Sequence, residues 1–167
     1  MSLAIIPGSF DPITVGHVDV IERASKIFDT VVVMVMVNRE KEYMFNIDRR
    51  TQLAKLSCDH LPNVKVLYSE GMLIDAVDEL GANVIVKGVR TIKDFKYEQD
   101  QAYWNKEHNP KAETMYLPSD PALKRVSSTL VRKLIEEDKP LDGVLMPTAI
   151  RKLKCDGIID RVSKESE

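Results

Sequence analysis

The stretch from Pro7 to His17 combines residue types that bind phosphate groups. Gly8 allows a close approach of the backbone or a positive φ, and Ser9 offers a hydroxyl and an amide. Gly16 and His17 open a segment of helical period, where free N–H groups and the positive end of the helix dipole form an anion site. A turn followed by a helix cap would explain a Gly-His pair alone. The complete pattern, Gly-Ser-Phe-Asp-Pro with Gly-His five residues after the aspartate, is more specific and predicts a phosphate-binding loop.

A second group of small polar residues, Ser127, Ser128 and Thr129, precedes another segment of helical period. The apolar residues that follow recur at helical spacing: Leu130, Val131, Leu134 and Ile135. A helix cap alone explains the three small residues. The free amides of a helix start would also bind an anion, so both interpretations stay open.

Basic residues follow two of the predicted strands. Lys41 lies in a charged loop, where a lysine is usually only solvated, and Lys87 and Arg90 follow a buried apolar run. The guanidinium of Arg90 is suited to binding two phosphate oxygens at once. Glu98, farther along, is an ion-pair partner on a helix of mixed charge if it has no ligand role.

The elements that position these residues alternate between two types. Short apolar runs predict strands at residues 3–6, 31–37, 64–67, 84–86 and 114–117. Segments of helical period predict helices over about residues 16–28, 48–57, 72–80 and 91–108, and one that begins at 127–129. This alternation predicts an α/β fold: a five-stranded parallel sheet with helices on both faces. Ligands of such sheets bind at the carboxyl ends of the strands, where the strand order reverses.

Composition limits the class of protein. The 167 residues and 18.9 kDa suit one domain over residues 1–167, with a polar tail at 160–167. A net charge of −2 and a pI near 6.0 argue against nucleic-acid binding. No apolar run approaches the roughly 20 residues that span a bilayer, so we expect no membrane partner. The two cysteines, Cys58 and Cys155, are far apart and no secretion signal is visible, which favours the cytoplasm.

The motifs resemble those of a known superfamily. Thr14-Val15-Gly16-His17 is similar to the T/H-x-G-H motif of the nucleotidyltransferases, and within that superfamily the chain resembles the bacterial phosphopantetheine adenylyltransferases. The resemblance extends from Ala4 to about Leu153. Other matching segments are Lys41 with Met44-Phe45, the block from Lys87 to Arg90 with Asp94, Phe95, Tyr97 and Glu98, and the segment Val126 to Arg132.

The resemblance implies that the sheet is of Rossmann-like, nucleotidyltransferase type. It also implies transfer of an adenylyl group from ATP to 4′-phosphopantetheine, which yields dephospho-coenzyme A, with coenzyme A as a further candidate ligand. It implies that His17 stabilises the transition state and that Lys41 and Arg90 assist catalysis. Phosphopantetheine would contact Ser9, Lys41, Leu73 and Lys87, although core packing explains Leu73 equally well. ATP would contact a larger set: Ser9, Phe10, His17, Gly88, Val89, Arg90, Glu98, Leu123, Lys124, Arg125, Val126, Ser127, Ser128 and Thr129. It also implies Mg²⁺ held by phosphates and water rather than by protein ligands, and a homo-oligomer, a hexamer.

Two positions depart from the family pattern. Lys87 replaces an arginine. The positive charge is kept, but a lysine cannot bind two phosphate oxygens with two parallel N–H groups as an arginine can. Leu123-Lys124-Arg125 replaces a segment that often carries aromatic residues. The alternatives are another nucleotidyltransferase of the superfamily, with nicotinamide mononucleotide or glycerol phosphate as acceptor, and a catalytically silent nucleotide-binding module.

Overall fold

The protein, seen here as a computed structural model, is described over residues 1–82 and 84–160. Residues 161–167, which make up most of the predicted polar tail at 160–167, lie outside the described residues. The strands are β1 (Leu3–Gly8), β2 (Thr30–Met36), β3 (Val64–Ser69), β4 (Val84–Val89) and β5 (Glu113–Pro118). The helices are α1 (Val15–Ser25), α2 (Ile47–Ser57), α3 (Leu73–Leu80), α4 (Ile92–His108), the short 3-10 helix η1 (Pro121–Leu123), α5 (Ser128–Glu136) and α6 (Pro147–Cys155).

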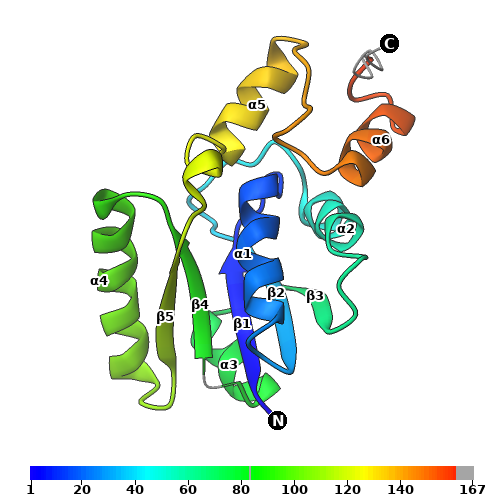
Figure 1. The fold of residues 1–167 in the computed structure, drawn as a ribbon. Helices are drawn as coiled ribbons and strands as arrows, with labels where there is room; N and C mark the ends of the chain where they lie inside the picture. Colours follow the sequence, from blue (N-terminus) through cyan, green and yellow to red (C-terminus); the bar gives the residue numbers. More distant parts are fainter. Residues whose placement is uncertain (83, 161–167) are drawn as a thin grey trace.

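The five strands form one parallel sheet in the order β3-β2-β1-β4-β5, which confirms the predicted fold class (Figure 1). The chain moves outward from β1 to β3, then returns to the other side of β1 with β4. The strand order therefore reverses between β1 and β4. In Figure 1 the strands point upward, and α5 lies beyond their carboxyl ends.

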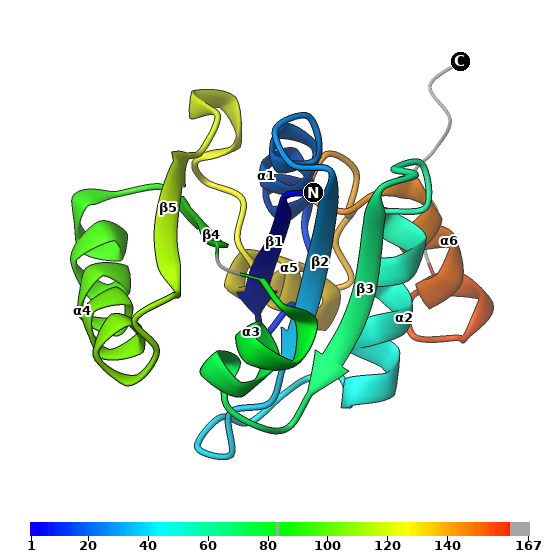
Figure 2. The same ribbon diagram turned by 90° about the horizontal axis from the view of Figure 1, so that it is seen from below.

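Alternation along the strands divides the core into two layers. Ala4 and Ile6 of β1 face the larger core with α1, α2, α5 and α6, whereas Ile5 faces a smaller core with α3. Figure 2 shows α1 and α3 on opposite faces of the sheet, with α4 beside β5. This arrangement follows from right-handed crossovers, because a connection that moves the other way across the sheet must cover the other face.

The predicted elements differ from the structure mainly at their ends and in one helix. The first predicted helix, at about 16–28, ends at Ser25, and β3, β4 and β5 each extend beyond the predicted residues. Gly81 closes α3 as expected, with a φ of 65°. Helix α6 was not predicted; Pro147 stands at its first position, and Ala149, Ile150 and Leu153 are buried. No helix within the described residues is long and apolar enough to cross a membrane.

Candidate active site

A cleft of about 790 Å³ opens at the carboxyl ends of the strands, where their order reverses between β1 and β4. Its walls come from the loops after β1, β2, β4 and β5 and from the first turns of α1 and α5. Many of the predicted site residues line this cleft: Ser9, His17, Lys41, Gly88, Arg90, Glu98, Leu123, Val126, Ser127, Ser128 and Thr129. A smaller cavity of about 390 Å³ shares five of them and adds Phe10, Leu73 and Lys87.

The imidazole of His17 is held in one tautomer by the start of α1. The backbone N–H of Thr14 donates to Nδ1 of His17 at 3.0 Å, and the Thr14 hydroxyl accepts from the backbone N–H of His17 at 3.3 Å. These reciprocal bonds form a capping box. Because Nδ1 accepts a hydrogen bond, the proton of the neutral ring is on Nε2. Burial, helped by the charge of Arg90, lowers the pKa of His17 to about 4. The site therefore contains a neutral N–H donor at neutral pH.

The ring of Phe10, in the loop after β1, is buried against the imidazole of His17. It is 4% exposed and meets the His17 ring edge-on, with the ring centroids 5.1 Å apart. A Cβ on Gly8 would lie 2.9 Å from Phe10, so glycine is required there by this aromatic ring and not by a positive φ. Phe10 itself has a φ of 46°, an uncommon conformation for a residue with a side chain. Its predicted contact with ATP stays a prediction.

Arg90 connects the end of β4 with the start of α5. Its Nη1 donates to the carbonyl of Val126 at 3.3 Å, and its Nε lies 3.3 Å from Oδ2 of Asp94. The side chain is partly exposed at the cleft and retains further N–H groups for a ligand. A Cβ on Gly88, at the same strand end, would lie 2.9 Å from Val20 of α1, so packing against α1 also requires glycine there.

Lys87 and Glu98 form an ion pair inside the smaller cavity. Nζ of Lys87 lies 2.8 Å from Oε2 of Glu98, and the two side chains are only 15% and 20% exposed. The sequence assigned Lys87 to one substrate and Glu98 to the other, and the structure brings them together. Leu73, the first residue of α3, packs against the smaller core, which confirms that interpretation. It also borders the same cavity, and its contact with phosphopantetheine stays a prediction.

The start of α5 offers the cleft backbone amides together with three hydroxyl side chains that differ in their contacts. Ser127 is the N-cap and accepts from the backbone N–H of Leu130 at 3.1 Å. The hydroxyl of Ser128 donates to the carbonyl of Pro12 at 2.8 Å, so its hydrogen is not free for a phosphate oxygen. The first N–H groups of a helix have no partner within the helix and can bind an anion.

Three residues predicted to contact ATP line neither the cleft nor the smaller cavity. Val89 ends β4, where its carbonyl accepts from the backbone of Ser119 at 2.9 Å. Lys124 and Arg125 are exposed beyond η1. Their contacts with ATP stay predictions, at the place where the sequence departs from the family pattern.

The structure adds buried charged residues that sequence reasoning did not assign to the site. Asp11 is 3% exposed and Arg50 is 1% exposed, and both lie beneath the loop that carries Lys41. Arg132 of α5 donates to the carbonyl of Asp11 at 2.7 Å. The available signals were the aspartate within the Gly-Ser-Phe-Asp-Pro pattern and the Asp-Arg-Arg start of α2.

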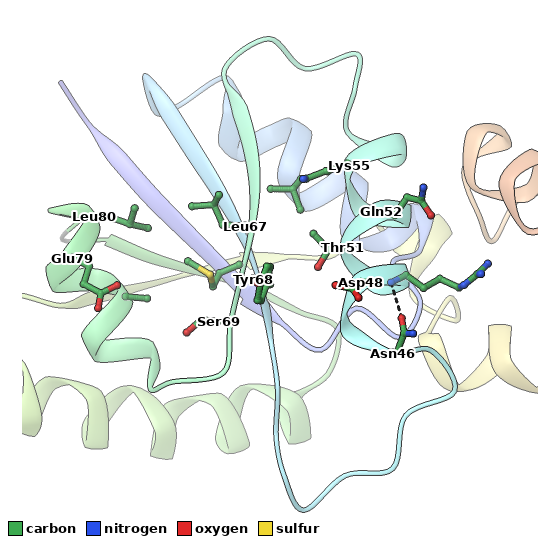
Figure 3. Close-up of a pocket in the computed structure, with 14 residues that line it drawn as sticks. Asn46, Asp48, Thr51, Gln52, Lys55, Leu67, Tyr68, Ser69, Glu79 and Leu80 are labelled. Atoms are coloured by element: carbon green, nitrogen blue, oxygen red, sulfur yellow. Dashed lines mark hydrogen bonds between the residues drawn. The ribbon is translucent and has the colours of Figure 1, made fainter.

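A further cavity, which is separate from the cleft and the smaller cavity and also has a volume of about 790 Å³, lies between α2, β3 and α3 (Figure 3). Figure 3 shows Thr51 of α2 on one side, and Leu67 of β3 and Glu79 of α3 on the other. It lies beside the edge strand β3, away from the β1–β4 reversal, and none of the predicted site residues lines it. The cleft at the reversal is therefore the candidate active site.

Comparisons with known proteins identify the family and the fold. The model of the cytidylyltransferase-like family matches residues 5–134. The chain is 40% identical to a phosphopantetheine adenylyltransferase from Symbiobacterium thermophilum, over 92% of this chain and 95% of that protein. It is 39% identical to one from Clostridium novyi, over 98% and 99% of the two chains. A solved structure from Vibrio parahaemolyticus, assigned as a nicotinate-nucleotide adenylyltransferase, shares the fold with a TM-score of 0.73 at 23% identity, over 95% of each chain.

Proposed function

The chain belongs to the phosphopantetheine adenylyltransferase family, and on this premise we propose that it transfers the adenylyl group of ATP to 4′-phosphopantetheine. The products are dephospho-coenzyme A and pyrophosphate, so the enzyme acts in coenzyme A biosynthesis. One observation carries the proposal: relatives of this name match nearly the whole chain at about 40% identity.

The chemistry requires positioning more than proton transfer. An oxygen of the 4′-phosphate attacks the α-phosphorus of ATP, and the bond from that phosphorus to the oxygen bridging to the β-phosphate breaks. Pyrophosphate leaves with the electron pair. Because the acceptor phosphate is already ionised near neutral pH, no general base is needed. The enzyme must hold two anions together and stabilise charge on the oxygens of the transferred group.

The residues of the cleft divide into two groups in this proposal. The Nε2–H of His17 and the guanidinium of Arg90 donate to the α-phosphate as charge develops, and the amides at the start of α5 bind the outer phosphates of ATP. Lys41 and Lys87 bind the acceptor phosphate. This division is supported by their places in the cleft and the adjoining cavity.

For magnesium, the described residues contain no group of three or more His, Cys, Asp or Glu side chains that could hold a metal. The few carboxylates of the cleft fit an ion that is bound mainly by substrate phosphates and water, as Mg²⁺ often is. When bound, Mg²⁺ neutralises charge on the phosphate oxygens. We expect EDTA to abolish turnover, excess Mg²⁺ to restore it, and calorimetry to show weaker ATP binding without the ion.

We further propose that residues 1–167 act as one nucleotidyltransferase domain, that the enzyme is cytoplasmic, and that it assembles as a hexamer. The assembly and the location rest on the resemblance to the family. Sedimentation equilibrium tests the hexamer directly: a mass of one or two chains at micromolar concentration would contradict it.

The test of the function compares acceptors. The protein is incubated with [α-³²P]ATP and, separately, with 4′-phosphopantetheine, nicotinamide mononucleotide and glycerol phosphate, and the adenylylated products are identified by mass. We expect product only with 4′-phosphopantetheine. Turnover of either other acceptor at a higher kcat/KM would select the alternative transferases, and ATP binding without turnover of any acceptor would select the silent module.

A further inference from the structure

The loop between β2 and α2 carries Lys41 and has little packing of its own. Residues 38–42 are exposed, yet Lys41 must face the cleft if it is to bind the acceptor phosphate. Within the loop, the backbone N–H of Lys41 donates to the carbonyl of Asn38 at 3.0 Å. The orientation of Lys41 therefore depends on what holds Asn38 and the end of the loop.

Arg50 of α2 holds the loop from beneath. Its guanidinium donates to three backbone carbonyls in different segments: Ser9 after β1 at 2.6 Å, Met36 at the end of β2 at 2.9 Å, and Phe45 at the end of the loop at 3.1 Å. The side chain is 1% exposed. Five donors in a rigid plane allow one arginine to join three segments, which a lysine ammonium could not do with the same geometry.

An aromatic contact extends this hold to the middle of the loop. The guanidinium of Arg50 stacks over the ring of Tyr43, 3.9 Å from its centroid. The hydroxyl of Tyr43 in turn accepts from the backbone N–H of Asn38 at 2.7 Å. A continuous set of contacts thus leads from Arg50 through Tyr43 and Asn38 to Lys41.

The carboxylate of Asp11 holds the far end of the same loop. Its two oxygens accept from the backbone N–H groups of Met44 at 2.8 Å and Phe45 at 2.9 Å. Burial lowers the pKa of the Arg50 guanidinium, whereas Tyr43 and Asp11 favour its charged form. The buried cation is therefore compensated by a buried anion and by carbonyl oxygens, as a buried charge must be.

We infer that Arg50 is a positioning residue for adenylyl transfer. It holds the loop that carries Lys41 and the loop that carries Ser9 at a fixed distance from each other, on the side of the cleft where the acceptor would bind. The inference rests on the proposed function for the identity of the acceptor. Arg50 is buried below the loops and does not line the cleft, so it acts through other residues. Displacement of a binding group by about 1 Å can cost two orders of magnitude in rate.

The test uses Arg50→Lys, which keeps the charge but cannot join the three carbonyls. We expect the KM for 4′-phosphopantetheine to rise about tenfold or more. The dissociation constant for ATP, measured by calorimetry, should rise clearly less, because Ser9 is predicted to contact both substrates whereas Lys41 is assigned to the acceptor alone. The matched control is Arg49→Lys, because the adjacent Arg49 pairs with Asp156 beside α6 and should leave both values unchanged. Equal losses for both substrates would overturn the inference, because they would indicate general destabilisation.

A double-mutant cycle separates positioning from a merely structural role. Because Arg50 would act partly through Lys41 and partly through the Ser9 loop, Arg50→Lys combined with Lys41→Ala should raise the acceptor KM by less than the product of the two single effects. Additive effects would overturn the inference. Where Arg50→Lys does not fold, Tyr43→Phe replaces it in the cycle, because it keeps the stacked ring and removes only the bond to Asn38; an unchanged acceptor KM would again contradict the inference.

Hydrogen exchange gives a readout that does not depend on activity. The amides of Asn38, Met44 and Phe45 should exchange at least about tenfold faster in Arg50→Lys or Tyr43→Phe than in the parent, with amides of the central strands unchanged. If the parent turns over none of the acceptors, the proposed function fails but this measurement still decides whether Arg50 holds the loop. Unchanged exchange in both variants would overturn the inference.

Discussion

At the scale of single residues, the role that we propose for His17 requires a neutral ring whose Nε2–H is the donor. We predict that His17→Ala lowers kcat on the order of a hundredfold and changes ATP affinity little, because the bond to the transferred phosphate strengthens mainly in the transition state. Single-turnover rates and calorimetry check the two parts. Rates within a few-fold of the parent would contradict the role.

His17→Gln is the control for the start of α1. A glutamine at this position can accept from the backbone N–H of Thr14 and restore the capping box without an imidazole. It should restore the melting temperature of the parent but not its kcat. Because the side-chain amide of glutamine also carries N–H donors, recovery of kcat would show that the reaction needs a neutral donor here and not an imidazole.

The ion pair of Lys87 and Glu98 leads to a prediction that the sequence alone would have stated differently. From the sequence, Lys87→Ala should remove only a cation at a strand end. In the structure the two side chains are largely buried, so Lys87→Ala also leaves the Glu98 carboxylate without its counter-charge. We predict a raised acceptor KM together with a lower melting temperature.

Adding Glu98→Gln to Lys87→Ala separates these effects. The double variant should recover the melting temperature but keep the raised acceptor KM, and Lys87→Arg alone should be tolerated or bind the acceptor more tightly. An acceptor KM that returns to the parental value in the double variant would assign Lys87 a structural role only.

At the scale of elements, the first turn of α5 combines a cap with an anion site, and the two can be separated. Ser127→Ala removes the bond to the Leu130 amide and should cost about 1 kcal/mol of stability. Ser127→Asp preserves the cap but adds a negative charge beside the expected phosphates. We predict that Ser127→Asp keeps the melting temperature of the parent and weakens ATP binding about tenfold or more. If Ser127→Asp binds ATP as tightly as the parent does, the phosphates of ATP do not bind at the start of α5.

The elements that the sequence predicted are those whose signal is local. Seven consecutive apolar residues at 31–37 indicated β2, and Gly81 marked the end of α3. The local signal of helix α6 is weaker, because its three buried residues alternate with basic ones and only Pro147 marks its start. Its place against α2 depends on tertiary packing, which no single segment contains.

The contacts by which Asp11 and Arg50 hold the loop of Lys41 could not be predicted in the same way. A charged residue at a helix start is usually solvated, and the residues that keep Arg50 buried come from three separate segments. The pairing of Lys87 with Glu98 likewise depends on the distance between β4 and α4. Sequence reasoning located the cleft because the carboxyl ends of parallel strands must share one edge, but it could not show which side chains there contact one another.

At the scale of the whole molecule, the neutral state of His17 connects the site to global stability. The pKa of His17 is lowered from 6.5 in the unfolded chain to about 4 in the fold, so the unfolded chain binds more protons between these pH values. Stability is therefore fully present above about pH 6.5 and is lost as the pH falls towards about 4. We predict that this contributes a loss of roughly 1 to 3 kcal/mol, or several degrees in melting temperature.

The contribution of His17 is isolated by comparison with His17→Gln, which keeps the capping box and does not titrate. Melting temperatures of the parent and the variant, measured from pH 8 to pH 4 in matched ionic strength, should diverge below about pH 6.5, with the parent falling more steeply. Asp156 contributes in a different range, because Lys152 lowers the pKa of its carboxyl below 3.8 and its stabilisation is lost only in stronger acid. Parallel curves between pH 6.5 and pH 4 would mean that His17 titrates alike in the folded and unfolded chains, and would remove the basis for a neutral donor in the site.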